Sequence, residues 1–479
     1  MRVLFLNPPF RNAPFSRSSR SPAVTKSGTL YYPVWLAYAA GVLEKDGFEI
    51  KLIDGPARRL SESDVVKAAR AFDPDVIVVD TSTPSIYSDV ETASSVKAAV
   101  KKAFVILVGT HPSALPEETL GLSRSIDAVA IGEYDHTIRD LCRALGSGRG
   151  PADIPGISFR RGDAIVHNGK RPSIEDLDGL PFVTSVYKRH LNVKDYFFAA
   201  SFHPFVMIMT GRGCPFGCSF CVYPQVFHPG KCRFRSAGSV ADEFEYVKRE
   251  LPHVKEIGIE DDTFTVDPKR TGEICRELIN RKVKMPWYAN VRADLDLETM
   301  VMMKKAGCRL IIAGFESGSQ EVLDKVHKGV TVERMERFSH DAKRAGLLVH
   351  GCFMIGNPGD RLDTVLETID FAIRLNCDTA QFFPLMVYPG TEAYEWARDN
   401  GYLSSERFSD WVTAEGLHNT VVSTEHFSNK ELVRLANYAR RRFYMRPGYI
   451  IYKMARCLAD PSELARTLIS LRTFYRHLV

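Results

Sequence analysis

The sequence predicts an α/β protein with two successive βα series and a helical C-terminal region. Two observations carry this prediction. Short apolar runs alternate with helical patterns across residues 1–145, and the same alternation returns across residues 201–400. Size and composition agree, because 479 residues that are 45% hydrophobic and 25% charged are typical of a globular protein with two or three domains.

The N-terminal series predicts a Rossmann-like, doubly wound sheet. Its regular βαβ alternation favours parallel strands with helices on both faces. We expect strands at 3–6, 49–54, 75–80, 104–109 and 128–131, and helices at 34–45, 63–71, 90–102 and 134–145. Residues 146–200 begin with a stretch rich in proline, glycine and charge, and we interpret them as a connector.

The second series predicts a partial (β/α)6 barrel of the TIM type. Its strands are expected at 205–210, 256–260, 287–290, 310–315, 349–355 and 379–385. In barrels of this type, chemistry takes place at the carboxyl ends of the strands. Residues 401–479 show helical patterning and form the predicted C-terminal region.

The net charge of +5 is unevenly distributed. Residues 430–479 carry eleven Lys and Arg against three Asp and Glu, a net of +8, which leaves the rest of the chain at −3. This basic tail, with Arg440, Arg441 and Arg442 near its start, indicates a solvated face or attraction of an anionic or membrane-associated substrate. The excess does not extend over the whole chain, and we expect no nucleic-acid partner.

The chain has no apolar run close to the roughly 18 to 20 residues that a membrane span needs. Its N-terminal residues also lack the layout of a signal peptide. We therefore expect a cytoplasmic protein without a transmembrane segment, while peripheral membrane contact stays open. In that compartment, the ten cysteines are expected to be reduced thiols or metal ligands.

Three of these cysteines have the spacing of an iron–sulfur ligand set. Cys214, Cys218 and Cys221 form the pattern Cys-x3-Cys-x2-Cys directly after the first strand of the second series. A cubane of four irons normally takes four cysteines, so three thiolates leave one iron open for chemistry. The alternative is a structural zinc site with Cys232 or His228 as the fourth ligand, although zinc sites usually contain paired Cys or Cys/His units.

This cysteine string, with the aromatic Phe220 before its last cysteine, resembles the signature of the radical SAM superfamily. The resemblance extends over roughly 200 residues and implies that S-adenosylmethionine (SAM) chelates the open iron. It also implies SAM contacts from three later strand ends. They are Asp262, for the ammonium of the methionine moiety, Glu316 and Ser317 for ribose or amino groups, and Gly356 and Asn357 for adenine. Arg233, Arg235 and Ser236 are further candidates, for steadying the anionic cluster or a carboxylate.

A doubly wound domain ahead of such a barrel resembles the cobalamin-binding arrangement. The resemblance implies contacts from the strand ends, because ligands bind there in open α/β sheets. The candidates are Pro8, Thr81, Ser82, Thr83, Gly109, Thr110, His111, Gly132 and Glu133. The usual cobalt-ligating string Asp-x-His-x-x-Gly is absent, so the lower cobalt position is expected to be water, empty or shielded. Another nucleotide or a purely structural domain are the alternatives, but no Gly-x-Gly-x-x-Gly follows the first strand.

Together these features resemble the cobalamin-dependent radical SAM enzymes. The resemblance implies a 4Fe–4S cluster, SAM and cobalamin, and most closely a methyltransferase that acts on an unactivated carbon. A small-molecule or lipid-like substrate is expected, with an anionic one favoured by the tail, and an external electron donor such as flavodoxin or ferredoxin. Ring closure, rearrangement or oxidation without methyl transfer is one alternative, and a non-catalytic iron–sulfur or zinc protein is another. No single catalytic side chain stands out.

Overall fold

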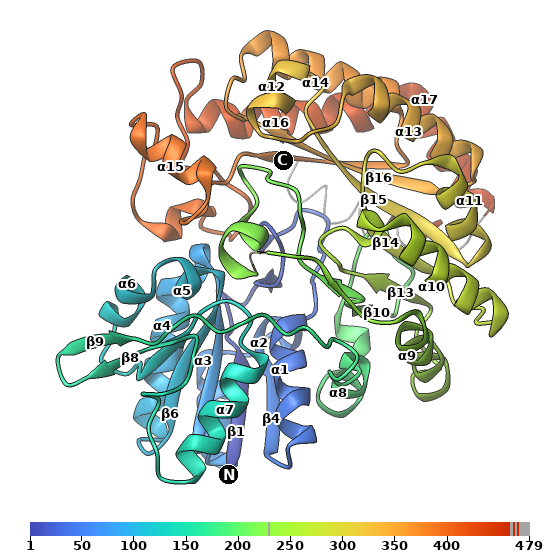
Figure 1. Cartoon of the computed structure of the whole chain (residues 1–479). Coiled ribbons are helices and arrows are strands. Elements are labelled where there is room, and N and C mark those ends of the chain that lie inside the picture. Colours follow the sequence, from blue (N-terminus) through green and yellow to red (C-terminus); the bar gives the residue numbers. More distant parts are fainter. Residues whose placement is uncertain (229, 460–462, 465–466, 469–479) are drawn as a thin grey trace.

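The structure is a computed structural model that describes residues 1–228, 230–459, 463–464 and 467–468. It contains two large sheets, the N-terminal one in blue and cyan and the second in green to orange (Figure 1). Part of the predicted C-terminal region, including three arginines of the basic tail, lies outside the described residues; these are Arg466, Arg472 and Arg476.

The N-terminal sheet confirms the doubly wound prediction. Its strand order is β4-β1-β5-β6-β7-β8-β9, and the strands from β4 to β7 are parallel. Helix α1 packs beside α7, and α3 packs beside α4. The order reverses between β1 and β5, which is where open α/β sheets bind ligands. The elements are β1 (Arg2–Asn7), α1 (Val34–Lys45), β4 (Glu49–Asp54), α3 (Glu62–Phe72), β5 (Val76–Thr81), α4 (Ile86–Ala99), β6 (Phe104–Gly109), β7 (Ala128–Ala130) and α7 (Asp135–Gly146).

The region expected to be a connector contributes to this sheet. Strands β8 (Ile157–Arg161) and β9 (Ala164–His167) form an antiparallel hairpin on its edge, and α8 (Val183–His190) follows. The hairpin turns at Gly162, whose φ is +61°. An edge hairpin is half exposed, so its short strands carry charge and lack the long apolar runs of the central strands. For this reason the search for apolar runs did not predict these two strands.

The second sheet confirms the partial barrel. Its six strands are all parallel, in the order β10-β13-β14-β15-β16-β17, and no pairing joins β10 to β17 in the described part of the chain. The barrel is therefore open along β17. The strands are β10 (Phe205–Ile208), β13 (Glu256–Ile259), β14 (Trp287–Arg292), β15 (Cys308–Glu316), β16 (Leu348–Ile355) and β17 (Thr379–Pro384). The helices between them are α9 (Ala237–Glu250), α10 (Pro268–Asn280), α11 (Leu297–Lys305), α12 (Gln320–Lys325), α13 (Val332–Arg344) and α14 (Leu362–Leu375).

The C-terminal region is only partly helical. Helix α15 (Glu392–Asp399) lies just before it. The region itself contains α16 (Asn429–Tyr444), which runs along the open edge at β17, and α17 (Pro447–Ala459). Most of 401–428 is irregular apart from the short helix η5 (Phe408–Trp411), which packs on η1 (Thr83–Ser85) of the N-terminal domain. Among the described helices, none combines the length and apolarity that a membrane crossing requires.

A long loop between β1 and α1, residues 8–33, reaches from the N-terminal sheet to the barrel. It contains the small hairpin β2 (Phe15–Ser16) and β3 (Ala23–Val24). At its end, the ring of Tyr32 stacks on Tyr196 with centroids 3.7 Å apart, and its hydroxyl donates to the Phe205 carbonyl at 2.7 Å. The loop is thus fixed to the first barrel strand.

Candidate functional site

The cysteine loop follows the short strand β11 (Gly211–Arg212) and is held in place by hydrogen bonds from a side chain that follows it in the sequence. The side-chain amide of Gln225, in the helix η3 (Tyr223–Phe227), donates to the carbonyls of Cys218, Ser219 and Cys221, each at 3.0 Å. Cys214, Cys218 and Cys221 are free thiols that are only partly buried. Three accessible thiols on one braced loop fit the ligand set of a cubane with one open iron.

Two cations lie beside this loop. The guanidinium of Arg292 lies 3.8 Å from the ring centroid of Phe216, between the first two cysteines. Burial raises the pKa of the Cys218 thiol, and the positive charge of Lys328 opposes that rise. Carboxylates also lie close, since the charge of Glu316 adds to the rise at Cys218. Burial and then the charge of Asp262 raise the pKa of Cys221. The two cations partly offset these negative charges beside the predicted thiolate ligands.

The zinc alternative finds no support in this geometry. Across the described ranges, no three His, Cys, Asp or Glu side chains converge as a single-ion site requires. The thiol of Cys232 donates to the Gly213 carbonyl at 3.4 Å, and His228 Nε2 lies 3.3 Å from an Asp262 oxygen. A cubane differs, because each thiolate binds its own iron.

Glu316 ends β15 in a left-handed conformation, with φ at +64°. Its carboxylate is buried and pairs with Lys328 Nζ at 2.8 Å. A Cβ on Gly314 would lie 2.3 Å from Glu316 Oε1, so a larger residue there would displace the Glu316 carboxylate from this position. The adjacent Ser317 is committed to the protein, because its hydroxyl lies 3.0 Å from Thr368 Oγ1 and accepts from the Ser319 N–H. Of these two residues, Glu316 is the one whose charge acts on the cysteine loop.

The predicted adenine segment after β16 is a tight turn closed by Asp360. One Asp360 oxygen accepts the N–H groups of Gly356 and Asn357 at 2.8 and 2.9 Å. Burial raises the pKa of Asp360 to about 6. The side-chain oxygen of Asn357 is buried and has no hydrogen-bond partner in the part of the chain that the structure describes, so it remains available to a ligand donor.

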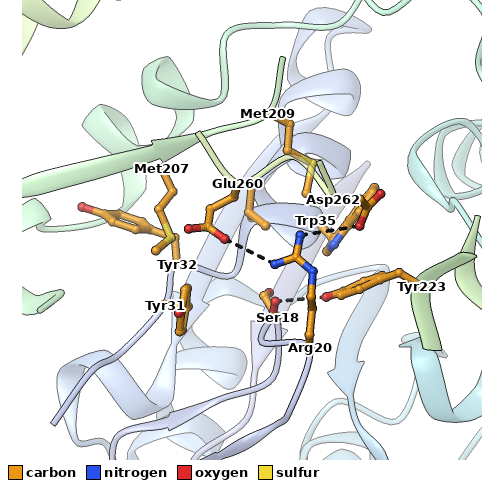
Figure 2. Close-up of a pocket in the computed structure, with 11 residues that line it drawn as sticks. Ser18, Arg20, Tyr31, Tyr32, Trp35, Met207, Met209, Tyr223, Glu260 and Asp262 are labelled. Atoms are coloured by element: carbon orange, nitrogen blue, oxygen red, sulfur yellow. Dashed lines mark hydrogen bonds and ion pairs between the residues drawn. The ribbon is translucent and has the colours of Figure 1, made fainter. Parts of the chain in front are cut away.

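Asp262 lies in a small pocket with Arg20, a residue that sequence analysis did not select (Figure 2). The Arg20 guanidinium reaches within 3.6 Å of Asp262 and 3.8 Å of Glu260, and it donates to the Asp261 carbonyl at 2.9 Å. Asp262 also accepts the Gly213 N–H at 3.1 Å, which ties it to the cysteine loop. Arg20 comes from the β1–α1 loop, and no local sequence signal could place it here.

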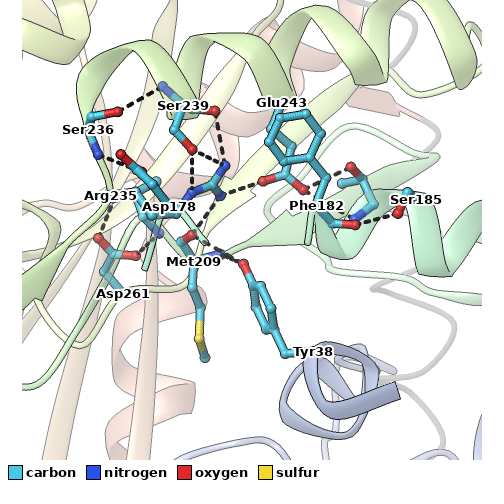
Figure 3. Close-up of polar contacts among 12 residues, drawn as sticks. Tyr38, Asp178, Phe182, Ser185, Met209, Arg235, Ser236, Ser239, Glu243 and Asp261 are labelled. Atoms are coloured by element: carbon cyan, nitrogen blue, oxygen red, sulfur yellow. Dashed lines mark hydrogen bonds and ion pairs between the residues drawn. The ribbon is translucent and has the colours of Figure 1, made fainter. Parts of the chain in front are cut away.

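The arginines after the cysteine loop pair with protein carboxylates. Arg235 contacts Glu243 at 2.5 Å and donates to the Met209 carbonyl at 3.1 Å, which braces the end of β10 (Figure 3). Ser236 caps α9. Arg233 pairs with Glu133. Both arginines are therefore already paired within the protein, and their role towards a cluster or a carboxylate at the site stays a prediction.

Glu133 bridges the two domains. Burial alone would raise its pKa, but the Arg233 hydrogen bond and the charges of Arg212 and Arg233 bring that pKa down to about 2. Arg212 Nη1 also contacts Asp135 at 2.9 Å. The Glu133 carboxylate, predicted as a cobalamin contact, is thus already occupied by two arginines.

The other cobalamin candidates lie at the carboxyl end of the N-terminal sheet, where most of them form hydrogen bonds with neighbouring residues of the chain. Gly109 has φ at +119°, and a Cβ there would lie 2.2 Å from the Thr81 carbonyl oxygen. The remaining contacts are Thr81 Oγ1 to the Val108 carbonyl, Ser82 to Ser85, Thr83 Oγ1 to His111 Nδ1, the Gly132 N–H to Ser113, and the Pro8 carbonyl to Arg17; Thr110 begins the next helix.

Several buried polar atoms at this end lack partners among the described residues. They are Asp80 Oδ2, His111 Nε2 and Tyr134 Oη, each at or near a strand end. Orphaned polar atoms of this kind fit a ligand rich in amides, as the edge of a corrin ring is. The His111 ring lies 4.8 Å from Phe408, and burial lowers its pKa to about 3, so it is neutral.

The comparisons with known proteins agree with this geometry. A B12 binding domain model matches residues 20–142, and a Radical SAM superfamily model matches residues 208–372. An uncharacterized methyltransferase of Pyrococcus horikoshii is 31% identical over 452 residues, which cover 94% of each chain. The anaerobic magnesium-protoporphyrin IX monomethyl ester cyclase of Rubrivivax gelatinosus is 26% identical, over 94% of this chain and 79% of its own.

A solved structure shares the fold. It is the radical SAM methyltransferase TsrM from Kitasatospora setae, with tryptophan and a SAM analogue bound. The TM-score is 0.67 at 20% identity, over 84% of this chain and 77% of that chain.

Fold, site and comparisons define a two-domain enzyme that uses a 4Fe–4S cluster, SAM and cobalamin. The chain belongs to the family of cobalamin-dependent radical SAM enzymes, and within it to the methyltransferases.

Proposed function

We propose that this methyltransferase acts on an unactivated carbon of a small-molecule or lipid-like substrate. One observation carries the proposal: the strand-end loops of both sheets meet at one interface. A Cβ on Gly132 would lie 2.9 Å from the Phe227 carbonyl oxygen, and Arg212 joins the cysteine loop to Asp135. These contacts bring the carboxyl end of the N-terminal sheet next to the segment that carries the cysteine loop, which supports one shared active site for the two cofactors.

When bound, the three cofactors supply a radical that removes substrate hydrogen and a methyl group that replaces it. The residues of the chain bind and orient. Cys214, Cys218 and Cys221 would hold the cluster. Phe220, Asp262, Glu316, Ser317, Gly356 and Asn357 are the proposed SAM residues. Pro8, Thr81, Ser82, Thr83, Gly109, Thr110, His111 and Gly132 are the proposed cobalamin residues, with Glu133 holding the two domains together.

The segment around η5 contributes by excluding water. Phe408 lies over His111, and buried Trp411 donates its indole N–H to the Val387 carbonyl at 2.6 Å. A dry interface protects reactive radicals from side reactions. An external donor such as flavodoxin or ferredoxin is proposed to supply the electron, in a cytoplasmic setting that keeps the free cysteines reduced.

The test is anaerobic reconstitution with cobalamin, reductant and SAM labelled in its methyl carbon. We expect 5′-deoxyadenosine from reductive cleavage and label transferred to an added candidate substrate. The cyclase relative favours ring closure as the second candidate, and it predicts 5′-deoxyadenosine with an unlabelled product. A reconstituted enzyme with full iron that never forms 5′-deoxyadenosine would refute both.

A further inference from the structure

A cavity of about 640 Å³ lies along the open edge of the barrel. It runs between β17, residues 25–31 of the β1–α1 loop, and the helices α16 and α17. Tyr31 lines both this cavity and the small pocket that holds Arg20 and Asp262. The cavity therefore lies next to the pocket beside the cysteine loop, with Tyr31 between them, and reaches the C-terminal helices.

Most of the cavity wall is apolar. The lining includes Phe198, Phe383, Tyr449, Met454 and Leu468. A wall of this kind binds an apolar body by excluding water, and its volume is within the range of small-molecule sites.

Three cations line this cavity, and one of them, Lys453, is paired with the lining carboxylate of Glu463 at 2.8 Å. The other two, Lys26 and Arg440, share one neutral partner. Lys26 Nζ donates to Asn437 Oδ1 at 3.0 Å, and Arg440 Nη1 donates to the same oxygen at 2.7 Å. Arg440 also donates to the Phe382 carbonyl at 3.1 Å. No carboxylate of the described residues forms an ion pair with either cation. Lys26 and Arg440 therefore lie together, and among the described residues neither has a paired carboxylate.

Neighbouring groups respond to this uncompensated charge. Burial, with the charge of Arg440, lowers the pKa of Lys26 to about 8. His418, another lining residue, has its pKa lowered to about 4, chiefly by burial; its hydrogen bond with the Ser21 carbonyl opposes the fall, and the charges of Arg440 and Lys26 add to it. Other buried arginines differ, since Arg212 faces Asp135 and Arg235 faces Glu243.

We propose that this cavity binds the substrate, and that the substrate is an amphiphile with a carboxylate or phosphate group. Its anionic group contacts Lys26 and Arg440, and its apolar body extends along the wall towards Tyr31. This inference rests on the proposed function and names the substrate class for it. It also gives the three arginines of the basic tail different roles. Arg440 lines the cavity, whereas Arg441 and Arg442 are exposed.

The test uses two fluorescent probes with the cobalamin-loaded full chain. 1-Anilinonaphthalene-8-sulfonate is apolar and anionic, and N-phenyl-1-naphthylamine lacks the sulfonate. Arg440→Gln and Lys26→Gln should each weaken sulfonate binding roughly tenfold, the scale of one charge-assisted hydrogen bond, and leave the neutral probe unchanged. Arg441→Gln and Arg442→Gln are matched controls on the same helix and should leave both probes unchanged.

Displacement of the sulfonate probe distinguishes the ligand groups. Dodecanoate and dodecyl phosphate should compete, with their order identifying the preferred anion, and dodecanol should compete poorly. Two controls exclude a folding defect in Arg440→Gln. Its near-ultraviolet circular dichroism spectrum should match that of the wild type, and Arg440→Lys should restore binding of the sulfonate probe. Equal losses for both probes, or losses as large in Arg441→Gln, would overturn the anion site. Failure of the wild-type enzyme to cleave SAM would instead reject the proposed function, and probe binding would still report on the cavity.

Discussion

Arg212 Nη1 lies 2.9 Å from Asp135 Oδ2, and both side chains are almost fully buried between the two domains. The guanidinium also lies 4.7 Å from the ring centroid of Trp35. This ion pair joins the start of the cysteine loop to the first turn of α7. The position of the cysteine loop relative to the N-terminal sheet therefore depends on this pair together with the buried pairs that Glu133 forms with Arg212 and Arg233.

Breaking that pair should destabilise the protein strongly. Removal of one member of a buried ion pair leaves the other uncompensated, at a cost of about 3 to 5 kcal/mol. We expect Arg212→Met to lower the thermal unfolding temperature by many degrees in calorimetry. The control is Arg124→Met, whose ion pair with Asp163 is exposed and should contribute about 0 to 1 kcal/mol. Similar losses in both variants would contradict this role.

The cluster ligands should be distinguishable by iron content. Cys218→Ala removes a thiol from the braced loop, so reconstituted protein should lose most of its iron and visible absorption. Cys232→Ala is the matched control, because that thiol bonds to the Gly213 carbonyl and is not a predicted ligand. If Cys232→Ala lost as much iron as Cys218→Ala, the three-thiolate assignment would be wrong.

Glu316 should support SAM binding. A charge-assisted hydrogen bond contributes about 1.5 to 3 kcal/mol, so Glu316→Ala should weaken SAM binding roughly tenfold or more. Calorimetric titration of the reconstituted protein with SAM measures this loss. Iron content should stay normal, because no predicted ligand changes. Unchanged SAM affinity would mean that Glu316 serves only to neutralise Lys328.

Asp80 should make stability depend on pH. Burial raises its pKa to about 7, against the opposing charge of Arg17. The folded state then binds a proton that the unfolded state releases near pH 4, so stability falls as pH rises from about 4 to about 7. Each unit of pKa difference corresponds to about 1.4 kcal/mol.

Asp80→Asn should remove this dependence. We expect its unfolding temperature to exceed that of the wild type at pH 8, by more than at pH 5. The exposed Asp163→Asn is the control and should follow the wild-type profile. A parallel shift at both pH values would assign the effect to packing and not to ionisation.

Cobalt should lack a protein histidine ligand. His111 bonds to Thr83 and packs against Phe408, and its context does not match the usual cobalt-ligating string. Electron paramagnetic resonance of the cob(II)alamin-loaded protein should show no nitrogen superhyperfine splitting from the lower position. Splitting that disappears in His111→Ala would show the opposite.

Local sequence determined the elements and the cofactor chemistry of this protein. Apolar runs predict both parallel sheets because their strands are buried on both faces, and β5 is buried at all six positions. The three cysteine ligand candidates lie within eight residues, so their spacing is visible in the sequence. The edge hairpin β8–β9 was not predicted from the sequence, because partly exposed strands need no such apolar run.

Only the tertiary structure decided which distant side chains meet. Arg20 reaches Asp262, and Glu133 meets Arg233, across long stretches of chain that no periodic pattern connects. The tail likewise carries its charge in sequence, but folding against β17 separates the half-buried Arg440 from its exposed neighbours. The spacing of apolar residues along the sequence shows which face of a helix or strand is buried. Ion pairs between domains depend instead on how the complete domains pack together.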